Sequence, residues 1–123
     1  MKKNLDFCTL TFGDQYVIST IDEGVIFSLD KAYETFLIIL EHFKDKPFVY
    51  IGNRKNSYSI DPLIYKETSK VNSLKGIAIV SESLIALKSI EIEKLFLQKP
   101  FEGFDNMEDA KQWVNMIINQ KLA

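Results

Sequence analysis

The chain has 123 residues, a hydrophobic fraction of 46% and a formal net charge of −2, which fits one folded domain spanning residues 1–123. Its lysines are scattered rather than clustered, so the sequence gives no electrostatic footprint for nucleic acid or an anionic membrane. A single cysteine excludes an intramolecular disulfide, and no apolar stretch reaches the roughly 20 residues needed to span a bilayer. We therefore expect a cytoplasmic protein without membrane insertion.

The first elements form an antiparallel hairpin. Polar and apolar residues mix over Leu5–Phe12, Gly13 and Asp14 make a turn, and Tyr16–Ile21 is β-branched and aromatic. Asp22–Gly24 then interrupts the pattern, and its two acids have the character of turn residues. Val25–Phe27 fits either a short strand or an apolar lead-in to the next helix.

A helix over residues 29–43 and a buried strand follow. Ser28 is a suitable N-cap, and apolar residues repeat at helical spacing up to Phe43. Four apolar residues, Phe48–Ile51, are typical of a central parallel strand buried on both faces, which the chain leaves at Gly52.

Three further elements are predicted in the second half of the chain before Pro100. Asp61 as N-cap and Pro62 in the first helical position predict a short helix ending near Ser69. The segment 74–80 reads as a second buried strand, and a helix capped by Ser81 or Ser83 should end before Pro100.

The chain closes with a short strand over Phe101–Phe104 and a helix. Asp105–Glu108 has the form of a capping box, and Trp113 borders the core face of that helix. The members of the core face are Met107, Ala110, Val114, Ile117 and Ile118. The element order ββαβαβαβα predicts an α/β fold, with helices packed on a mainly parallel sheet that opens with an antiparallel hairpin.

Unusual chemistry collects in the loop between the central strand and the helix at Pro62. Loops beyond the carboxyl ends of parallel strands are the usual binding positions of open α/β sheets. Arg54 is the only arginine in the chain, and its planar fork suits carboxylate or phosphate recognition. The alternative is that Arg54 pairs with a nearby carboxylate or carbonyl and holds the loop. The candidate binding residues are Asn53, Arg54, Asn56, Ser57, Tyr58, Ser59 and Asp61.

Catalytic chemistry is not indicated. One histidine and one cysteine do not make a usual zinc site, and neither nucleotide-binding nor hydrolase motifs occur, so we expect no metal, no cofactor and no enzyme activity. His42 is expected to be structural, and Cys8 to be a buried, inert thiol. Tyr50, Tyr58 and Tyr65 either line a pocket or patch around the loop or belong to ordinary core and rim packing.

Most of the chain resembles the STAS-like (SpoIIAA-like) domains, which include a group related to lipid-binding CRAL-TRIO folds. The resemblance is carried by the opening hairpin, the alternating units, the strand Leu-Lys-Gly-Ile-Ala-Ile-Val and the C-terminal segment 99–114. It implies a STAS-like fold and a non-enzymatic regulatory role. One branch of the family is switched by phosphorylation of a serine in an Asp-Ser-Ser-Gly-like context after the central strand. That motif is absent here, and Ser57 and Ser59 lie near the equivalent place.

Two functions follow as hypotheses. The first is a STAS-like regulatory or interaction domain that binds a protein partner or a second copy of itself through residues 52–61 and the adjoining helices. The second is a carrier of a small apolar or lipid-like ligand between the helices and the sheet.

Overall fold

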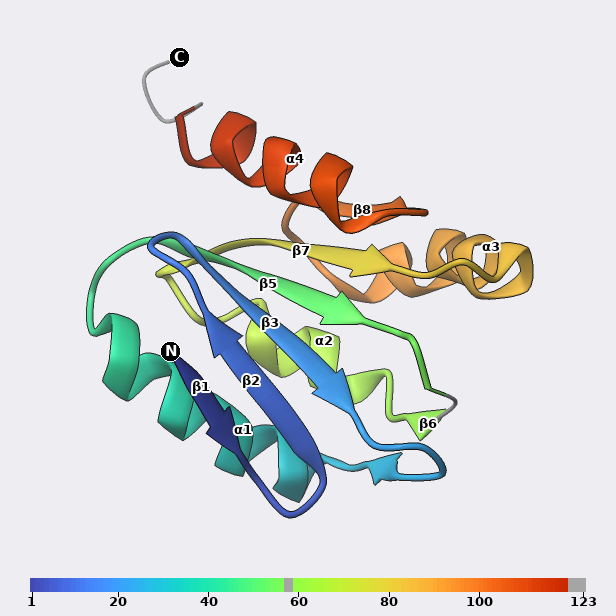
Figure 1. Ribbon diagram of the computed structural model, residues 1–123, viewed down its shortest axis with the longest axis horizontal. Coiled ribbons are helices and arrows are strands. Elements are labelled where there is room, and N and C mark those ends of the chain that lie inside the picture. Colours follow the sequence, from blue (N-terminus) through green and yellow to red (C-terminus); the bar gives the residue numbers. More distant parts are fainter. Residues whose placement is uncertain (57–58, 120–123) are drawn as a thin grey trace.

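A computed structural model describes residues 1–56 and 59–119. Its strands are β1 (Lys2–Asn4), β2 (Cys8–Phe12), β3 (Tyr16–Ile21), β4 (Ile26–Phe27), β5 (Phe48–Asn53), β6 (Ser59–Ile60), β7 (Leu74–Val80) and β8 (Phe101–Phe104). Its helices are α1 (Leu29–Phe43), α2 (Leu63–Thr68), α3 (Leu84–Glu93), the short 3-10 helix η1 (Lys94–Phe96) and α4 (Met107–Asn119). Figure 1 shows their arrangement.

Six strands form one sheet in the order β1-β2-β3-β5-β7-β8. The pairs β1·β2 and β2·β3 are antiparallel, whereas β3, β5, β7 and β8 run parallel to one another. The predicted α/β class, with a mainly parallel sheet opened by an antiparallel unit, is confirmed. All four parallel strands end at the same edge, which therefore brings the loops after them together.

The opening unit has one strand more than the hydrophobic pattern predicted. β1 consists of Lys2, Lys3 and Asn4, all exposed, so no apolar residue marks it in the sequence. The first predicted strand also starts later, at Cys8 instead of Leu5. Two lysines on an edge strand discourage pairing with another chain, a common protection of sheet edges.

A second, two-stranded sheet settles the open question about Val25–Phe27. Ile26 and Phe27 form β4 and pair in parallel with Ser59 and Ile60 of β6. Each of these strands has two residues and pairs with a strand more than 30 positions away in the chain. Such short strands show no recognisable sequence pattern.

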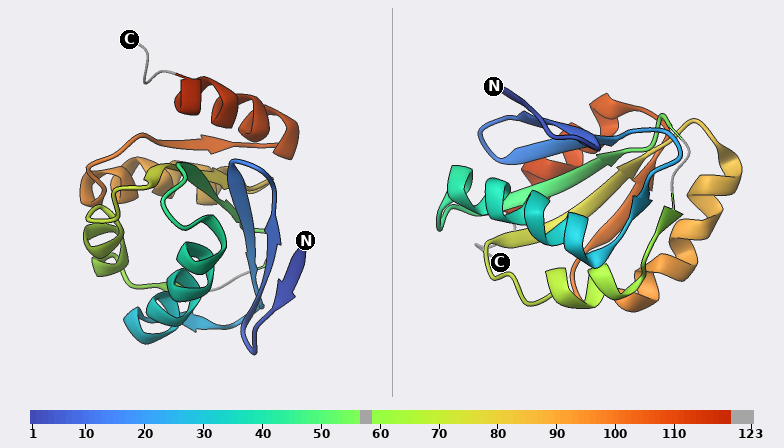
Figure 2. Two further views of the ribbon diagram at one scale, coloured as in Figure 1. Left: turned by 90° about the vertical axis from the view of Figure 1, so that its left-hand side faces the viewer. Right: turned by 90° about the horizontal axis from the view of Figure 1, so that it is seen from below.

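The helices form two unequal layers around the sheet, as the two views of Figure 2 show. α1, α2 and α3 cover one face, where their buried side chains join a large core that includes Phe36, Ile64 and Ile90. α4 covers the other face through Ala110, Val114 and Ile118. Met107, Trp113 and Ile117 pack partly buried beside them, as the sequence pattern predicted.

α1 spans residues 29–43, as predicted, because the local signals are strong. The Ser28 hydroxyl accepts a hydrogen bond from the Lys31 amide at 3.4 Å, and Ile39 and Phe43 face the sheet, buried. Full burial of each such apolar side chain stabilises the fold by ~1.5–3 kcal/mol.

The central strand β5 runs two residues further than predicted, through Gly52 to Asn53. Gly52 pairs with both Ser19 and Ile79, and a Cβ at this position would lie 2.9 Å from Ile79 Cδ1. The glycine therefore permits close packing against β7 and does not end the strand. The first five residues of β5 are buried, as expected for a central parallel strand.

Two helix starts differ by one residue from the sequence prediction. α2 begins at Leu63, so Pro62 lies just before the helix, and the Asp61 carboxylate accepts the Leu63 amide at 3.0 Å. At α4 the cap is Asn106, whose Oδ1 accepts the Asp109 amide at 2.8 Å, rather than Asp105.

The remaining helix start follows one of the two predicted alternatives. For α3 the cap is Ser83, whose hydroxyl accepts the Ala86 amide at 3.2 Å. Ser81 is buried and accepts a hydrogen bond from the Ser83 amide instead.

Candidate functional site

The loop after β5 is tied to its surroundings by hydrogen bonds at several points. The Arg54 amide donates to the Val80 carbonyl at 2.8 Å, and Asn56 Nδ2 donates to the Ile21 carbonyl at 3.1 Å. The Ser59 amide donates to the Val25 carbonyl at 3.0 Å. These bonds join the ends of β3 and β7 to the loop, so the described part of the loop is built into the edge of the sheet.

The structure separates the predicted loop residues by role. Asn53 ends β5 beside Val80, Asn56 bonds to the backbone of β3, and Asp61 accepts the first amide of α2. Ser59 is exposed in β6. Ser57 and Tyr58 lie outside the described residues.

Arg54 turns away from the loop and forms a clamp with α3 and α2. Its Nη1 and Nη2 donate to the two carboxylate oxygens of Glu93 at 3.0 and 2.6 Å, and Nη2 also donates to the Tyr65 hydroxyl at 3.1 Å. The side chains of Arg54 and Glu93 are only 12% and 14% exposed. A bidentate, largely buried pair of this kind fixes the relative position of the two elements that carry it.

Two further hydrogen bonds complete the surroundings of the Glu93 carboxylate. The Tyr65 hydroxyl donates to Oε1 at 2.5 Å, and the Ser89 hydroxyl donates to Oε2 at 3.0 Å. Burial by itself would raise the pKa of Glu93, but the hydrogen bonds from Arg54 and Tyr65 and the charge of Arg54 bring that pKa below its usual value. The carboxylate is therefore ionised at neutral pH.

This arrangement matches the structural alternative for Arg54. Because the guanidinium already donates to a carboxylate, a phosphate on Ser59 would have to compete with Glu93 for that guanidinium.

Sequence reasoning missed Glu93 and Ser89. Glu93 stands three residues after the buried Ile90, on a side of α3 that helical spacing places close to the core. That spacing was the available signal.

The described tyrosines around the loop belong to the interior. Tyr50 is buried and stacks on Phe36 with ring centroids 5.6 Å apart, and Tyr65 is buried in the clamp. The void that they border between the helices and the sheet measures about 20 Å³. This void is too small for an apolar ligand, so it is not the interior site that a carrier would need.

α3 presents an unusual outer surface beside the clamp. Its inner side is held by Ile90, which is 1% exposed, and by the hydrogen-bonded Glu93. The large apolar residues that remain exposed on α3 and η1 are Leu84 (69%), Ile85 (81%), Ile92 (64%), Leu95 (81%) and Phe96 (43%). We call these five residues the α3 face. Large apolar side chains gathered on one exposed side of a helix are unusual for a surface that contacts only water.

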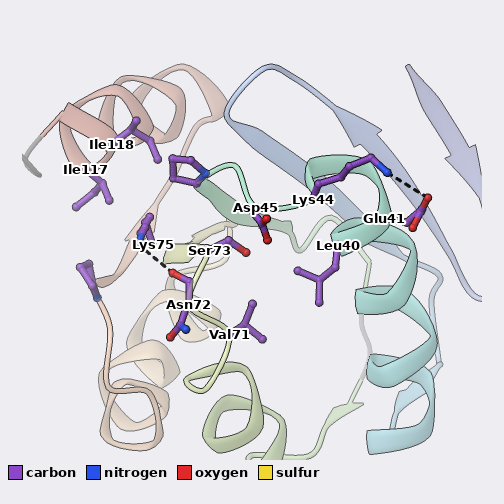
Figure 3. Close-up of a pocket in the computed structure, with 12 residues that line it drawn as sticks. Leu40, Glu41, Lys44, Asp45, Val71, Asn72, Ser73, Lys75, Ile117 and Ile118 are labelled. Atoms are coloured by element: carbon purple, nitrogen blue, oxygen red, sulfur yellow. Dashed lines mark hydrogen bonds and ion pairs between the residues drawn. The ribbon is translucent and has the colours of Figure 1, made fainter.

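Two surface hollows lie away from the clamp. One, of about 990 Å³, opens at the opposite end of the sheet, where α1, α4 and the starts of the strands meet (Figure 3). Polar groups border it, including the Lys44–Glu41 ion pair at 3.5 Å and Lys75, whose Nζ donates to the Asn72 carbonyl at 2.9 Å. The other, about 560 Å³, is an apolar groove between α1 and α2 that contains Tyr33 and Leu37.

The other residues singled out in the sequence take part in core packing or in a turn. Cys8 is buried at the start of β2, and burial raises the pKa of its thiol to about 11, as expected for an inert thiol. His42 stacks on Phe12 with ring centroids 4.0 Å apart. Glu23 and Gly24 lie in a turn, in which Gly24 has a positive φ of 78°.

The described residues offer neither a metal site nor a membrane-spanning helix. Among residues 1–56 and 59–119, no group of three or more His, Cys, Asp or Glu side chains is placed to hold a metal ion. No helix in those residues has the length and apolar character needed to cross a membrane.

Comparison with known proteins identifies the fold. No protein-family model and no curated protein matches the sequence. Among solved structures, the chain is similar to an uncharacterised protein of the DUF3478 family with a SpoIIAA-like fold from Shewanella loihica PV-4, whose crystal structure was determined at 2.25 Å. The TM-score is 0.60, the sequence identity is 13%, and the match covers 93% of this chain and 98% of that chain. The chain therefore has a SpoIIAA-like fold, as the resemblance predicted.

Proposed function

We propose that residues 1–123 form a non-enzymatic regulatory domain that binds other protein surfaces through the α3 face and the neighbouring loop 53–61. The observation that carries this proposal is the α3 face itself. Five large apolar side chains project from α3 and η1, and the inner side of α3 is fixed by a largely buried ion pair. Exposed apolar side chains gathered on one element are the usual mark of an interaction surface.

The distribution of exposed apolar residues supports the same assignment. Within the described residues, the large apolar side chains that are exposed outside the α3 face are Met1, Ile26, Leu29, Tyr33, Leu37, Leu63 and Met116. Only Met116 lies on α4, whereas most of the others belong to the helical layer on the opposite face of the sheet. The helical layer that contains α3 therefore carries most of the exposed large apolar side chains of the described residues.

The clamp supports a non-enzymatic role. General acid–base groups need a pKa near the working pH, and Glu93 has a lowered pKa because it is ion-paired and hydrogen-bonded. Cys8 is buried, and because burial raises the pKa of its thiol to about 11, the thiol is protonated at neutral pH. The Arg54–Glu93 pair instead holds the loop and α3 together.

Quantitative pull-down from the native cells tests the proposal. Tagged wild type is compared with Ile85→Asp and with Met116→Asp, which makes the same change at an exposed apolar position on α4. We expect partners retained by wild type and by Met116→Asp to fall at least tenfold for Ile85→Asp. If the folded Ile85→Asp variant retains all of those partners, the α3 face is not the interaction surface.

A second candidate function is binding of a small apolar ligand in the groove between α1 and α2. Its volume of about 560 Å³ lies within the ~300–1,000 Å³ typical of ligand sites, and Tyr33 and Leu37 stand exposed along it. Native mass spectrometry of protein purified from its native cells tests this. A bound mass that disappears in Leu37→Asp supports the carrier function, and the mass of the chain alone in wild type contradicts it.

A further inference from the structure

We infer that the partner of the α3 face is a second copy of this chain, with the two α3 helices packed antiparallel about a two-fold axis. This inference rests on the proposed function and names the partner of the same surface. It is carried by the self-complementary arrangement of apolar and charged residues on α3.

The apolar residues lie on both sides of a central lysine. Leu84 and Ile85 occupy the first turn of α3, and Ile92 and Leu95 lie about two to three turns later on the same side of the helix. Lys88 lies between them in the middle of this stripe and is exposed. In an antiparallel pair, the first turn of one helix meets the last turn of the other, so apolar residues contact apolar residues at both ends.

The charges fit the same arrangement. Lys88 and Glu91 stand three positions apart, both on the exposed side of α3. In an antiparallel pair, a step forward along one helix is a step back along the other. When Leu84 of one copy lies opposite Leu95 of the other, the residue four positions after Leu84, Lys88, therefore lies opposite the residue four positions before Leu95, Glu91. Each Lys88 then meets Glu91 of the second copy, and the two-fold axis makes this pair twice.

The ion pairs within one copy leave Lys88 and Glu91 able to pair with a second copy. Glu91 contacts Lys94 Nζ through Oε2 at 3.2 Å and is still 71% exposed, so its carboxylate can accept a second cation. No ion pair of Lys88 occurs within the part of the chain that the structure describes. A parallel arrangement would place Lys88 against Lys88 and Glu91 against Glu91, and like charges face to face oppose association.

The size of the contact sets the expected strength. α3 and η1 together have 13 residues, which makes a helical segment roughly 20 Å long. One helix pair of this length buries less than the ~800 Å² per partner of a standard stable interface. We therefore expect a dissociation constant in the micromolar range, on the order of 10–100 μM.

Sedimentation equilibrium of the whole chain at about 5 μM to 1 mM tests the inference with three variants. Lys88→Glu and Glu91→Lys each place like charges in both contacts, and we expect each to weaken self-association at least tenfold. Mixing the two variants in equal amounts creates opposite charges in both contacts of the mixed pair, so the mixture should recover the wild-type dissociation constant. Lys46→Glu, an equal charge change in the exposed loop before β5, should leave association unchanged.

Every outcome of this experiment decides for or against the inference. Recovery in the mixture supports it, because an effect within one helix cannot be complemented by another molecule. Wild type that stays monomeric at 1 mM overturns it, as does a dimer that is insensitive to both single variants or fails to recover in the mixture. A monomeric chain whose Ile85→Asp variant still loses its cellular partners would overturn the inference and leave the proposed function standing.

Discussion

Replacing Arg54 by Met tests whether the clamp holds the loop and α3 together. The variant removes the two hydrogen bonds to Glu93 and the one to Tyr65, and leaves a carboxylate that is 14% exposed without its guanidinium. Breaking a buried ion pair from one side costs ~3–5 kcal/mol, and partial access of water lowers this. We expect Arg54→Met to reduce the free energy of unfolding by about 3 kcal/mol at pH 7.

Urea unfolding measures this change, with Lys55→Met as the matched control. Lys55 is the neighbouring cation in the loop and is exposed, so its replacement should change stability by less than ~0.5 kcal/mol. The double variant Arg54→Met, Glu93→Met should be more stable than the sum of the two single losses predicts, with a coupling energy of about 2 kcal/mol. Equal losses for Arg54→Met and Lys55→Met would refute the assignment.

The pH dependence provides an independent check of the same pair. The pKa of Glu93 is lower in the folded protein than in the unfolded chain. Its ionised form therefore contributes stability above the unfolded pKa of about 4.3, and this contribution is lost as pH falls through the lower folded pKa. The stability difference between wild type and Arg54→Met should shrink as pH falls from about 5 toward 3. A difference that stays constant over this range would contradict the ion-pair explanation.

Three more predictions concern the scaffold around the site. Because burial raises the pKa of the Cys8 thiol to about 11, a thiol reagent at pH 8 should label the folded protein only as fast as it opens, and rapid stoichiometric labelling would contradict this. Asn106→Ala should cost about 1 kcal/mol by removing the cap of α4, whereas Asp105→Ala should cost clearly less, and thermal unfolding distinguishes the two. Gly76→Ala should cost about 1–2 kcal/mol in urea unfolding because the new Cβ would lie 3.1 Å from the Pro100 carbonyl oxygen, and unchanged stability would show that this contact relaxes freely.

Local patterns in the sequence were sufficient for much of the fold. α1 was predicted with its observed bounds because Ser28 caps it and apolar residues recur at helical spacing. β5 and β7 were found because parallel strands buried on both faces read as continuous apolar runs. Each of these signals depends on residues that are neighbours in the chain.

Local patterns do not predict elements whose pairing partners lie far away in the sequence. β4 and β6 have two residues each and exist because they pair with each other, and β1 is held against β2 by backbone hydrogen bonds although its residues are polar. Two helix starts were displaced by one residue, since neighbouring polar residues offer nearly equivalent caps and only the folded geometry selects one, as it selects Asn106 over Asp105 at α4.

The candidate site was likewise predictable from the sequence only in part. The sequence singled out Arg54 because it is the only arginine, but its partner Glu93 lies 39 positions away and becomes a partner only when α3 packs beside the loop. The α3 face was also not predicted: helical spacing groups Leu84 and Leu95 with the buried Ile90, whereas the structure exposes both leucines. Packing of Ile90 against the sheet and pairing of Glu93 with Arg54 decide which side faces inward, and they leave the α3 face exposed.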